Sequence, residues 1–595
     1  MPLDRISPSI TTVRTTPFHV LLIKPTHYAD DGYPIRWMRS LIPSNSLASV
    51  YGLVADVADR QALGPEVDIL ITAMDETNAI FDPAREIRRL RRAGGRAVLF
   101  LVGVQSNQYP RAMDLAEPFI AAGIPVCVGG FHVSGCLSML DETPPEIAAA
   151  IERGISMFAG EGEAGRIERV LRDAYSGTLK PIYNYLKDQP NLVGEPVPIL
   201  PRDHIRRCYG NTTSFDLGRG CPFQCSFCTI INVQGRVSRF RDPDDLEKIV
   251  RANIAQGIHR FFITDDNLAR NRQWEDAFDR LIKLREDEGI KVQLNIQVDT
   301  LCHRIPGFVD KACKAGAEQI FFGLESVNAE NLIAVKKKQN RIEEYKELFH
   351  AWKRYPVVIT IGYILGFPGD TPESIRADID LIKREFPVDL IYFTNLTPLP
   401  GSEDHVNALR RGEWMDPDLN KYDLNHRVTH HPVMTDAEWD KAYSDAWEQF
   451  YTPEHMVTIL RRMFALGSNK KNMTVRYLMA YREFRRQYGM HPLEGGFVPV
   501  RRRHERRPGM PREPWGLFHL RYAWDVARVG LNALRTFRFL DREMRRIHRD
   551  PARRSYVDAA TVRPALAERP RKAAAEIKIP KLKSVPRRDS QVAAE

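Results

Sequence analysis

The chain is poor in cysteine and has no long apolar run. Only eight of its 595 residues are cysteine. No uninterrupted apolar run reaches the roughly 18 residues that a membrane-spanning helix needs. The first 17 residues lack the apolar core of a secretory signal. We therefore expect a disordered leader over residues 1–17 and a cytoplasmic protein, in which reducing conditions argue against disulfides.

Acidic residues are scarce only in the last part of the chain. The formal net charge is +10, but from Arg501 onward there are 25 Lys and Arg against 11 Asp and Glu, a net of +14. The first 500 residues therefore carry a net charge of −4. A basic segment of this kind can attract an anionic membrane surface or nucleic acid. No recognisable nucleic-acid-binding motif accompanies it, which makes nucleic acid the weaker alternative.

Residues 18–175 alternate short apolar runs with polar, helix-forming stretches. The runs are rich in β-branched residues and include FHVLLIK (18–24), VDILITA (67–73), AVLFLVG (97–103) and IPVCVGG (124–130). This pattern is typical of buried parallel strands joined by crossover helices. It predicts a doubly wound, Rossmann-like α/β domain, whose ligand would bind beyond the carboxyl ends of the strands.

The rest of the chain divides by composition and periodicity. Residues 176–210 are rich in proline and aperiodic, which predicts an extended linker. Residues 211–401 contain six strand candidates separated by helical patterns. They predict a parallel (β/α)6 partial TIM barrel with its chemistry at the carboxyl ends of the strands. Residues 402–498 predict a helical C-terminal domain, 499–550 a basic amphipathic helical segment, and 551–595 a disordered basic tail.

Three of the eight cysteines lie close together in the stretch GCPFQCSFC. Cys221, Cys225 and Cys228 follow the first predicted barrel strand with the spacing C-x3-C-x2-C. Zinc sites usually need four ligands, and no fourth Cys or His stands at a matching spacing. A C-x-x-C redox pair would not need Cys221. Three thiolates suit a [4Fe–4S] cluster in which one iron keeps an open position, and buried or zinc-binding thiols are the alternative.

This stretch resembles the radical S-adenosylmethionine (SAM) superfamily. Phe227, the aromatic residue before the third cysteine, is typical of it. The resemblance implies a [4Fe–4S] cluster on Cys221, Cys225 and Cys228, SAM on the fourth iron, and an external electron donor of the flavodoxin or ferredoxin type. Reductive cleavage of SAM would give a 5′-deoxyadenosyl radical.

The resemblance extends over about residues 211–400. FFITDDN (261–267), FFGLESVN (321–328) and GYILGFPGDT (362–371) are similar to stretches that lie near SAM in this family. The residues that these stretches and the cysteine loop imply for SAM binding are Phe227, Asp265, Glu325, Ser326, Gly366 and Pro368.

The first domain resembles the cobalamin-binding domain that precedes many radical SAM barrels. The similar stretches are PSNSLASVYGLV (43–54), VCVGGFHVSG (126–135) and FAGEGEAG (158–165). Small residues there would let a corrin approach the backbone. The resemblance implies cobalamin binding by Ser46, Ser49, Gly129, Gly130 and His132.

The sequence departs from one cobalamin motif. Mutases and methionine synthases carry Asp-x-His-x-x-Gly, whose histidine ligates cobalt. The turn after the first predicted strand reads KPTHYADDG, in which His27 lacks both the Asp and the Gly. We therefore expect His27 to be a local loop residue. Many cobalamin-type radical enzymes also lack the motif, so its absence does not decide against the cofactor.

These resemblances imply an enzyme. The leading hypothesis is a cobalamin-dependent radical methyltransferase acting on an unactivated carbon of an organic substrate, with lipid-like compounds among the candidates. A radical SAM cyclase or oxidoreductase without methyl transfer is an alternative, and a cobalamin- or cluster-binding sensor with a nucleic-acid-binding tail is another. Methylthiotransferases carry a second three-cysteine set in the N-terminal domain, which Cys127 and Cys136 alone do not supply.

Two regions of the C-terminal half stay open between a binding and a structural role. The segment 499–550 has Trp, Phe and Leu interleaved with Arg. It would either place the protein peripherally at the inner membrane surface or pack against the barrel. The stretch NHRVTHHP (425–432) offers three histidines, and we expect it to be a surface loop.

Overall fold

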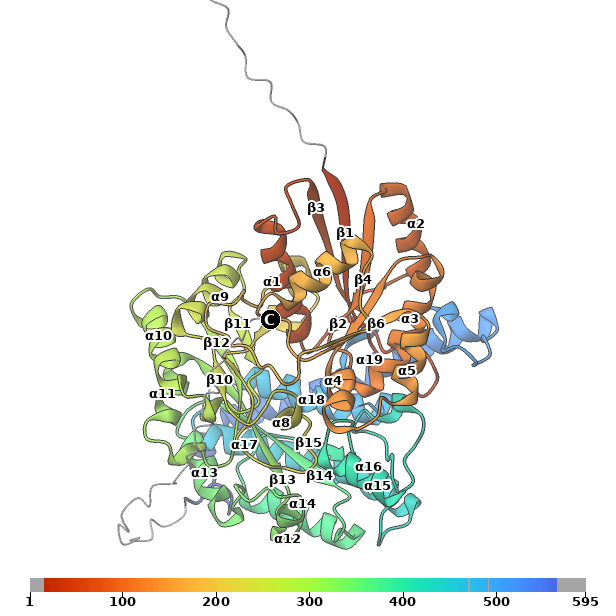
Figure 1. The fold of residues 1–595 in the computed structure, drawn as a ribbon. Coiled ribbons are helices and arrows are strands. Elements are labelled where there is room, and N and C mark those ends of the chain that lie inside the picture. The colour runs from red at the N-terminus through yellow and green to blue at the C-terminus, as the bar shows by residue number, and fades with distance from the viewer. Residues whose placement is uncertain (1–14, 469–470, 491, 564–595) are drawn as a thin grey trace, which may run out of the picture.

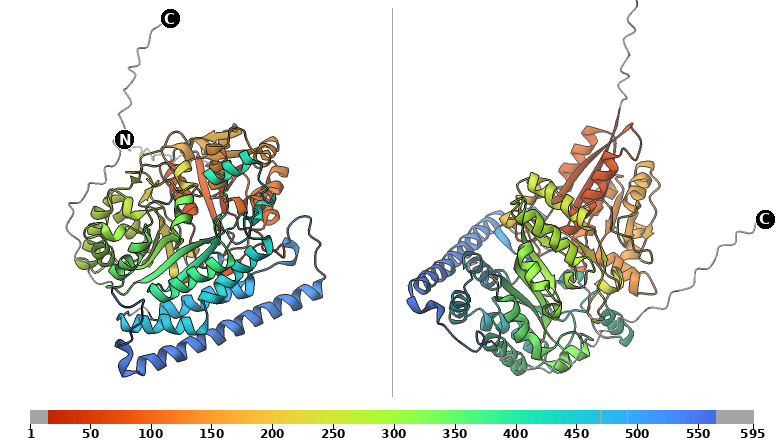
Figure 2. Two further views of the ribbon diagram at one scale, coloured as in Figure 1. Left: turned by 90° about the horizontal axis from the view of Figure 1, so that it is seen from below. Right: turned by 90° about the vertical axis from the view of Figure 1, so that its left-hand side faces the viewer.

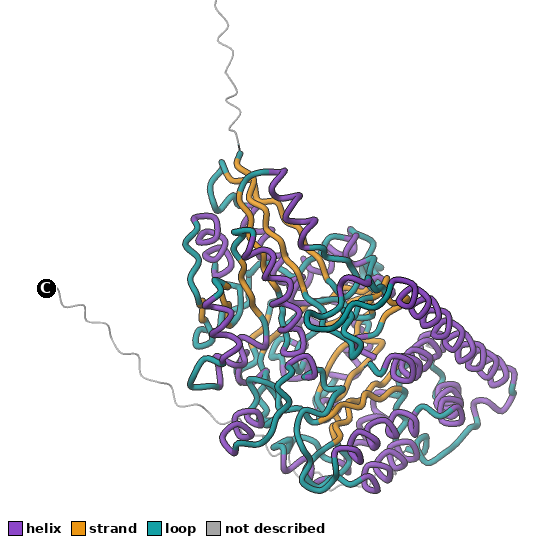
Figure 3. Tube along the Cα trace, turned by 90° about the vertical axis from the view of Figure 1, so that its right-hand side faces the viewer, coloured by secondary structure: helices purple, strands orange, loops and turns teal. Residues whose placement is uncertain are grey.

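The computed structural model describes residues 15–468, 471–490 and 492–563 (Figure 1). Two parallel sheets and a helical C-terminal region follow one another along the chain, so the predicted fold class is confirmed. Figure 3 shows the strands of both sheets flanked by helices. Residues 1–14 of the predicted leader and 564–595 of the predicted tail lie outside the described residues. Within the described part, no helix combines the length and apolarity needed to cross a membrane.

The first sheet has six parallel strands in the order β3-β1-β4-β5-β6-β7. Their bounds are β1 Thr16–Lys24, β3 Val67–Asp75, β4 Arg96–Leu101, β5 Val126–Gly129, β6 Ile155–Ala159 and β7 Ile182–Asn184. The chain builds outward from β1 in both directions, so the gap between the ends of β1 and β4 is a topological switch point, where such sheets bind ligands. The strand β7 lies within the predicted linker, whose backbone pairs with the edge of the sheet.

Helices cover both faces of this sheet. Side chains alternate along β1, so that Val20 and Leu22 pack toward one face while Leu21 and Ile23 pack toward the other. The first face carries α1 (Asn45–Asp59) and α6 (Arg166–Ser176). The opposite face carries α2 (Pro83–Ala93), α3 (Tyr109–Ala121), α4 (Phe131–Met139) and α5 (Pro145–Glu152).

The second sheet is the partial barrel, with six parallel strands in chain order. The strands are β8 Thr212–Phe215, β11 Arg260–Ile263, β12 Gln293–Val298, β13 Ala317–Glu325, β14 Val358–Leu365 and β15 Leu390–Asn395. The connecting helices are α9 Pro243–Ala255, α10 Trp274–Glu286, α11 Phe308–Ala315, α13 Tyr345–Trp352 and α14 Pro372–Glu385. Apolar side chains from strands and helices form one continuous core. Polar loops follow the carboxyl ends of the strands, and these ends are where a parallel barrel places its chemistry.

The C-terminal region returns to both domains. Its helices are α15 Glu403–Arg411, α16 Asp436–Phe450, α17 Pro453–Ala465, α18 Lys471–Tyr488 and α19 Trp515–Arg549. Between the last two, β16 (Gly496–Pro499) pairs antiparallel with β2 (Trp37–Ser40) of the N-terminal domain. Helix α19 is 35 residues long and runs along the outside of α17 and α18 (Figure 2, left).

Residues 551–563 belong to the tail that was predicted to be disordered, but they pack against the rest of the protein. Pro551–Arg554 form a short 3-10 helix. Asp558 then accepts a hydrogen bond from the buried Arg462 of α17 (Oδ2 to Nε, 2.7 Å), and Lys346 donates to the carbonyl oxygen of Ala559 (2.7 Å). A buried guanidinium needs an anionic partner, which gives a physical reason for residues 551–563 to depart from the expected disorder.

Candidate active site

The three cysteines lie in the loop at the carboxyl end of the first barrel strand. The loop begins after the two-residue strand β9 (Gly218–Arg219), which pairs with β10 (Arg239–Phe240). Its backbone is fixed by hydrogen bonds from the amides of Cys221 and Ser226 to the carbonyl oxygens of Gly235 and Val335, both 3.1 Å. The loop therefore has a fixed path, and its position agrees with the sequence-based expectation.

The environment of the thiols fits an iron–sulfur cluster better than a single ion. Burial raises the pKa of Cys221 to about 11 and that of Cys228 to about 12, so binding a metal must displace thiol protons. Tetrahedral zinc with Zn–S bonds of about 2.3 Å would hold its sulfurs about 3.8 Å apart. The sulfur atoms of Cys221, Cys225 and Cys228 do not form one of the groups of described residues whose ligand atoms all lie within 4.8 Å of one another. A larger, multinuclear group suits the wider spacing.

Lys337 and Gln339 complete the surroundings of the cysteines. The side-chain amide of Gln339 donates to the sulfur of Cys225 (3.4 Å). Lys337 pairs with Glu325 (Nζ to Oε1, 2.5 Å) and lies 5.7 Å from the centre of the Phe227 ring. Burial disfavours the Lys337 ammonium, but the negative charges of Glu325 and Cys225 outweigh burial and raise its pKa. This cation favours thiolate at the cysteines.

Of the residues expected to bind SAM, Phe227 and Glu325 line the main cavity of the protein. Glu325 ends β13 with a left-handed backbone (φ 63°), which is uncommon for a residue other than glycine. Strain of this kind persists where the surrounding structure requires it and is common at functional sites. Glu325 is therefore held with its carboxylate toward the cavity and Lys337.

The other residues expected to bind SAM do not line this cavity. Asp265 accepts a hydrogen bond from the amide of Leu217 (2.6 Å) and braces the loop, and burial raises its pKa to about 7. The hydroxyl oxygen of Ser326 accepts from the amide of Asn328 (3.0 Å). Pro368 is exposed. Asp265 and Ser326 therefore support the loops around the site.

Gly366 has a packing role that the sequence did not indicate. Its φ is +96°, and a Cβ there would lie 2.1 Å from the ring of Trp439, which is buried. We expect Gly366→Ala to lower the free energy of unfolding by about 3 kcal/mol through strain and overpacking. Gly412 also has a positive φ (+63°), but nothing lies within 4 Å of its added Cβ.

Gly412→Ala is therefore the matched control for Gly366→Ala. It should cost only about 1 kcal/mol, from the left-handed backbone alone. Urea unfolding followed by circular dichroism measures both variants. Equal losses would show that Trp439 does not limit the space at Gly366.

The main cavity has a volume of about 640 Å³ and lies where three parts of the chain meet. The barrel contributes Phe227 and Cys228, the N-terminal domain contributes loops after β1 and β4, and the C-terminal region contributes Asp423 and Glu494. Its walls are mainly apolar, with Ile35, Ile42, Phe131, Phe321, Ile364, Tyr392, Leu396 and Leu399 among the lining residues. A cysteine of the cluster loop and the ligand edge of the first sheet therefore face one shared space.

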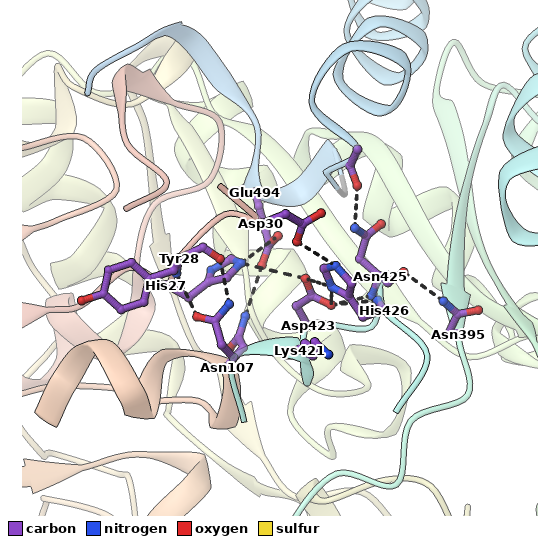
Figure 4. A network of polar contacts seen from close by, with 12 residues as sticks. His27, Tyr28, Asp30, Asn107, Asn395, Lys421, Asp423, Asn425, His426 and Glu494 are labelled. Carbon is purple, nitrogen blue, oxygen red and sulfur yellow. Dashed lines mark hydrogen bonds and ion pairs between the residues drawn. The ribbon is translucent and has the colours of Figure 1, made fainter. Parts of the chain in front are cut away.

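One end of the cavity is polar (Figure 4). The Nε2 atom of His27 lies 3.6 Å from Glu494 Oε2 and 4.0 Å from Asp423 Oδ2. His426 bridges Asp423 and Asp30 through its two ring nitrogens (2.9 and 3.0 Å). Asn107 donates to Glu494 Oε1 (3.3 Å). His27 is therefore part of a cavity-lining network, and His426 belongs to the same network, although its stretch was expected to be a surface loop.

Burial sets the charges of this network. It lowers the pKa of His27 to about 4, and burial together with Asp423 raises that of Glu494 well above its usual range. Burial also opposes the charged form of His426, but hydrogen bonds to Asp30 and Asp423 outweigh it and raise its pKa to about 10. At neutral pH the network therefore holds a neutral imidazole at His27 and an imidazolium at His426 paired with Asp423, beside a Glu494 carboxyl group whose ionisation is opposed by burial and by Asp423.

The raised pKa of His426 predicts a pH-dependent stability. Its contribution is complete below the unfolded pKa of about 6.5 and is lost as the pH rises through about 10. We expect His426→Gln to cost about 2 kcal/mol at pH 6, after allowance for partial exposure, and progressively less toward pH 10. Urea titrations at several pH values measure this trend. His430→Gln is the control, because His430 is exposed beside Asp436; a cost for His426→Gln that does not vary with pH would contradict the assignment.

A second cavity, of about 170 Å³, lies at the ends of β4, β5 and β6. Four of the residues expected to bind cobalamin line it: Ser46, Ser49, Gly129 and Gly130. These four residues are small and would let a flat ring and its tail approach the backbone. Larger side chains, among them Phe100 and Phe158, line the rest of the cavity. Phe131 lines both this cavity and the main one.

The position of His132 differs from the expectation. It is fully buried, and its ring lies against Tyr109 and Ser106 rather than in either cavity. His132 is the second residue of α4, and its ring packs against Tyr109 of α3 and Ser106, which precedes that helix. The similarity of the Gly-Gly-x-His stretch did not reveal this direction.

A buried network of ion pairs connects the cluster loop to the N-terminal domain. Arg219, two residues before Cys221, donates to Glu161 (2.7 Å) and Glu163 (2.7 Å), which follow β6, and to Asp216 (3.1 Å). Burial opposes ionisation of Glu163, but Arg219 outweighs it and lowers the pKa of this carboxyl group. The network links the cluster loop to the wall of the second cavity, since Glu161, Glu163 and Arg219 all line it.

A partial parallel barrel that holds three thiols on its first loop is the arrangement of enzymes that cleave SAM at an iron–sulfur cluster. Residues 216–382 match the Radical SAM superfamily. This part of the chain is therefore a radical SAM domain. The assignment made from GCPFQCSFC is confirmed, and with it the [4Fe–4S] cluster and SAM as the cofactors that such a domain uses.

The relatives that the chain resembles include two methyltransferases of Chlorobaculum tepidum. It is 28% identical over 319 residues to bacteriochlorophyllide d C-12(1)-methyltransferase, covering 51% of this chain and 64% of that protein. It is 26% identical over 435 residues to bacteriochlorophyllide d C-8(2)-methyltransferase, covering 67% and 89%. The chain thus spans somewhat less than two thirds of the first relative.

Among solved structures the chain resembles the cobalamin-dependent S-adenosylmethionine radical enzyme OxsB. The TM-score is 0.51 with 14% identity, covering 80% of this chain and 72% of that one. At this identity the likeness shows the fold alone, and it extends beyond the barrel to most of the chain.

Proposed function

We propose that this protein is a cobalamin-dependent radical SAM methyltransferase that acts on an unactivated carbon. The observation that carries the proposal is the main cavity, in which Phe227 and Cys228 of the cluster loop face loops of the N-terminal sheet. Methyl transfer needs a radical source and a methyl carrier that reach one substrate. The names of the two C. tepidum relatives, and the name of OxsB, support methyl transfer and cobalamin respectively.

The residues of the chain have distinct roles in this proposal. When bound, the cluster and SAM supply a 5′-deoxyadenosyl radical after one-electron reduction by an external donor, and cobalamin supplies the methyl group. Cys221, Cys225 and Cys228 hold the cluster, and Lys337 stabilises the thiolates of Cys225 and Cys228. The small residues along the second cavity, Ser46, Ser49, Gly129 and Gly130, hold cobalamin. Glu325, Phe227 and their supporting loops position SAM, and the apolar walls exclude water.

The cavity favours an amphiphilic substrate. Its walls are mainly apolar, and its polar end holds neutral His27, a Glu494 carboxyl group whose ionisation burial opposes, and a charge-balanced Asp423–His426 pair. Such an end suits hydroxyl, carbonyl or amide groups, because an unbalanced charge would lose its hydration there. A large apolar molecule with a neutral polar substituent, such as a tetrapyrrole or a lipid-like compound, fits this description.

Anaerobic reconstitution tests the proposal. The protein should bind iron, sulfide and cobalamin, and should form 5′-deoxyadenosine from SAM in the presence of a reductant. With an amphiphilic substrate, S-adenosylhomocysteine and a product heavier by one CH2 are expected. Formation of 5′-deoxyadenosine with a product that gains no CH2 would favour the cyclase or oxidoreductase alternative. Absence of both iron and 5′-deoxyadenosine would overturn the proposal.

We further infer that α19 holds the enzyme on anionic lipid. Leu517, Leu520, Trp524, Leu531 and Leu534 recur at helical spacing, and all are exposed, Leu520 to 74% and Trp524 to 67%. Arginines that include Arg535, Arg538, Arg542, Arg545 and Arg546 are exposed along the same helix. Apolar side chains beside a row of arginines are typical of helices that lie in the bilayer interface. The alternative raised by the sequence was packing against the barrel. Helix α19 packs on α17 and α18, and its buried Leu540 and Ile547 join the core of the barrel.

Vesicle flotation tests this role. The protein should float with vesicles of phosphatidylcholine and phosphatidylglycerol, and less with phosphatidylcholine alone. The Leu520→Asp, Trp524→Asp double variant should bind about 10- to 100-fold more weakly. Val433→Asp changes an isolated exposed apolar residue and is the matched control. Equal partitioning of all three proteins would contradict the inference.

A further inference from the structure

Three side chains with metal-binding groups lie close together in the N-terminal domain, and a fourth approaches from α15, beyond the last barrel strand. His132 and Cys136 lie one turn apart on α4, so they share a face of the helix. Glu146 is in the first turn of α5. One ligand atom from each of these three residues lies within 4.8 Å of the other two. His405 of α15, which follows the last barrel strand, interacts electrostatically with His132 and Glu146.

Of the two ring nitrogens of His132, one contacts Ser106 and the other lies near Glu146. Nδ1 lies 3.1 Å from the hydroxyl oxygen of Ser106. Nε2 is buried without a hydrogen bond, 3.6 Å from Glu146 Oε1. When Nδ1–H donates to Ser106, Nε2 presents a lone pair to a carboxylate, an arrangement that a cation between them would stabilise. Metal-binding histidines typically donate their other ring N–H in this way.

A second buried nitrogen without a hydrogen bond comes from the barrel side. Nδ1 of His405 is buried and has no hydrogen-bond partner. The approach of α15 to α4 depends on Gly135, where a Cβ would lie 2.4 Å from the carbonyl oxygen of Pro400. Two buried imidazole nitrogens in this region therefore lack hydrogen bonds, whereas buried polar atoms are normally hydrogen-bonded.

We propose that His132, Cys136 and Glu146 bind one zinc ion. The group within 4.8 Å does not include His405, whose side chain would move onto the bound ion as the fourth ligand. Two imidazoles, a thiolate and a carboxylate form a borderline-soft, four-donor set of the kind that zinc prefers. The ion would join α4 and α5 to α15. It would also fix Leu399 and Pro400, which precede α15 and line the main cavity. This zinc site is separate from the cluster loop and holds the two domains in register around the cavity.

Metal analysis of the full chain tests the site. Protein from zinc-supplemented cells should contain about one zinc per chain, and Cys136→Ala and Glu146→Gln should each lower zinc at least tenfold while leaving iron unchanged. Cobalt(II) added to zinc-depleted protein should give a thiolate-to-cobalt absorption band that Cys136→Ala removes and His405→Ala alters. Glu146 is about one third exposed, so Glu146→Gln separates loss of metal from loss of fold, which circular dichroism checks.

Cys313→Ala is the matched control, because Cys313 is a half-buried cysteine of α11 outside both sites. It should keep both zinc and the cobalt band. Zinc content that stays the same in Cys136→Ala and Glu146→Gln, or a wild-type protein that takes up neither zinc nor cobalt with a thiolate band, would overturn the proposal.

Discussion

Cys225→Ala is expected to yield a folded protein without its iron–sulfur cluster and to lower 5′-deoxyadenosine formation by at least about 10³-fold. Cys225 is the buried central cysteine of the loop, and its sulfur accepts a hydrogen bond from Gln339. With one of three thiolates absent, two ligands remain for four irons, and the site for SAM on the open iron is lost with the cluster. Because the three ligands act as one unit, a second cysteine substitution should add little.

The measurement is made anaerobically after reconstitution with iron and sulfide. Iron, sulfide and 5′-deoxyadenosine are determined for wild type, Cys225→Ala and the control Cys313→Ala. The control thiol lies on α11, away from the cluster loop, so its iron content and activity should match wild type. Retention of iron and of 5′-deoxyadenosine formation by Cys225→Ala would remove the basis for the radical mechanism.

Features carried by short stretches of sequence were predictable. Short apolar runs that alternate with helix-forming stretches predicted two parallel sheets, because a strand buried on both faces must be apolar along its length. The spacing of Cys221, Cys225 and Cys228 revealed the cluster loop, because one loop supplies all three ligands. Both features depend on residues that are close together in the sequence, so a single sequence is enough to predict them.

Features assembled from distant segments were not predictable. Asp423 and Glu494 reach His27 from the C-terminal region, and each is an ordinary acidic residue where it stands in the sequence. The strand pair β2–β16 joins segments more than 450 residues apart. His132 and Gly366 lay in stretches that the family resemblance highlighted, yet their side-chain directions and neighbours depend on tertiary packing.

Loss of the buried cation at Arg219 should strongly destabilise the contact between the two domains. Arg219→Met removes the nearest cation from Glu163 and Asp216, which keep only the longer contacts with Arg241. It also removes one of the two arginines that pair with Glu161, which keeps Arg239. Removing one member of a buried ion network typically costs about 3–5 kcal/mol, because the remaining charges stay desolvated. Arg251→Met is the control, since Arg251 pairs with Glu247 and Glu288 at the surface; it should cost less than about 1 kcal/mol.

The pH dependence of this cost distinguishes lost charge pairing from lost packing. In the wild type, burial opposes ionisation of Asp216 and Glu163, but Arg219 lowers the pKa of both. Their stabilisation is complete above the unfolded pKa of about 4 and is lost as the pH falls through the lower folded values. In Arg219→Met these carboxylates keep only the longer contacts of Arg241 with Asp216 (3.5 Å) and Glu163 (3.7 Å), and protonation relieves their reduced pairing. The difference in urea stability between the two proteins should therefore be largest near pH 7 and shrink toward pH 4. A difference that is constant over this range would assign the cost to packing of the arginine side chain.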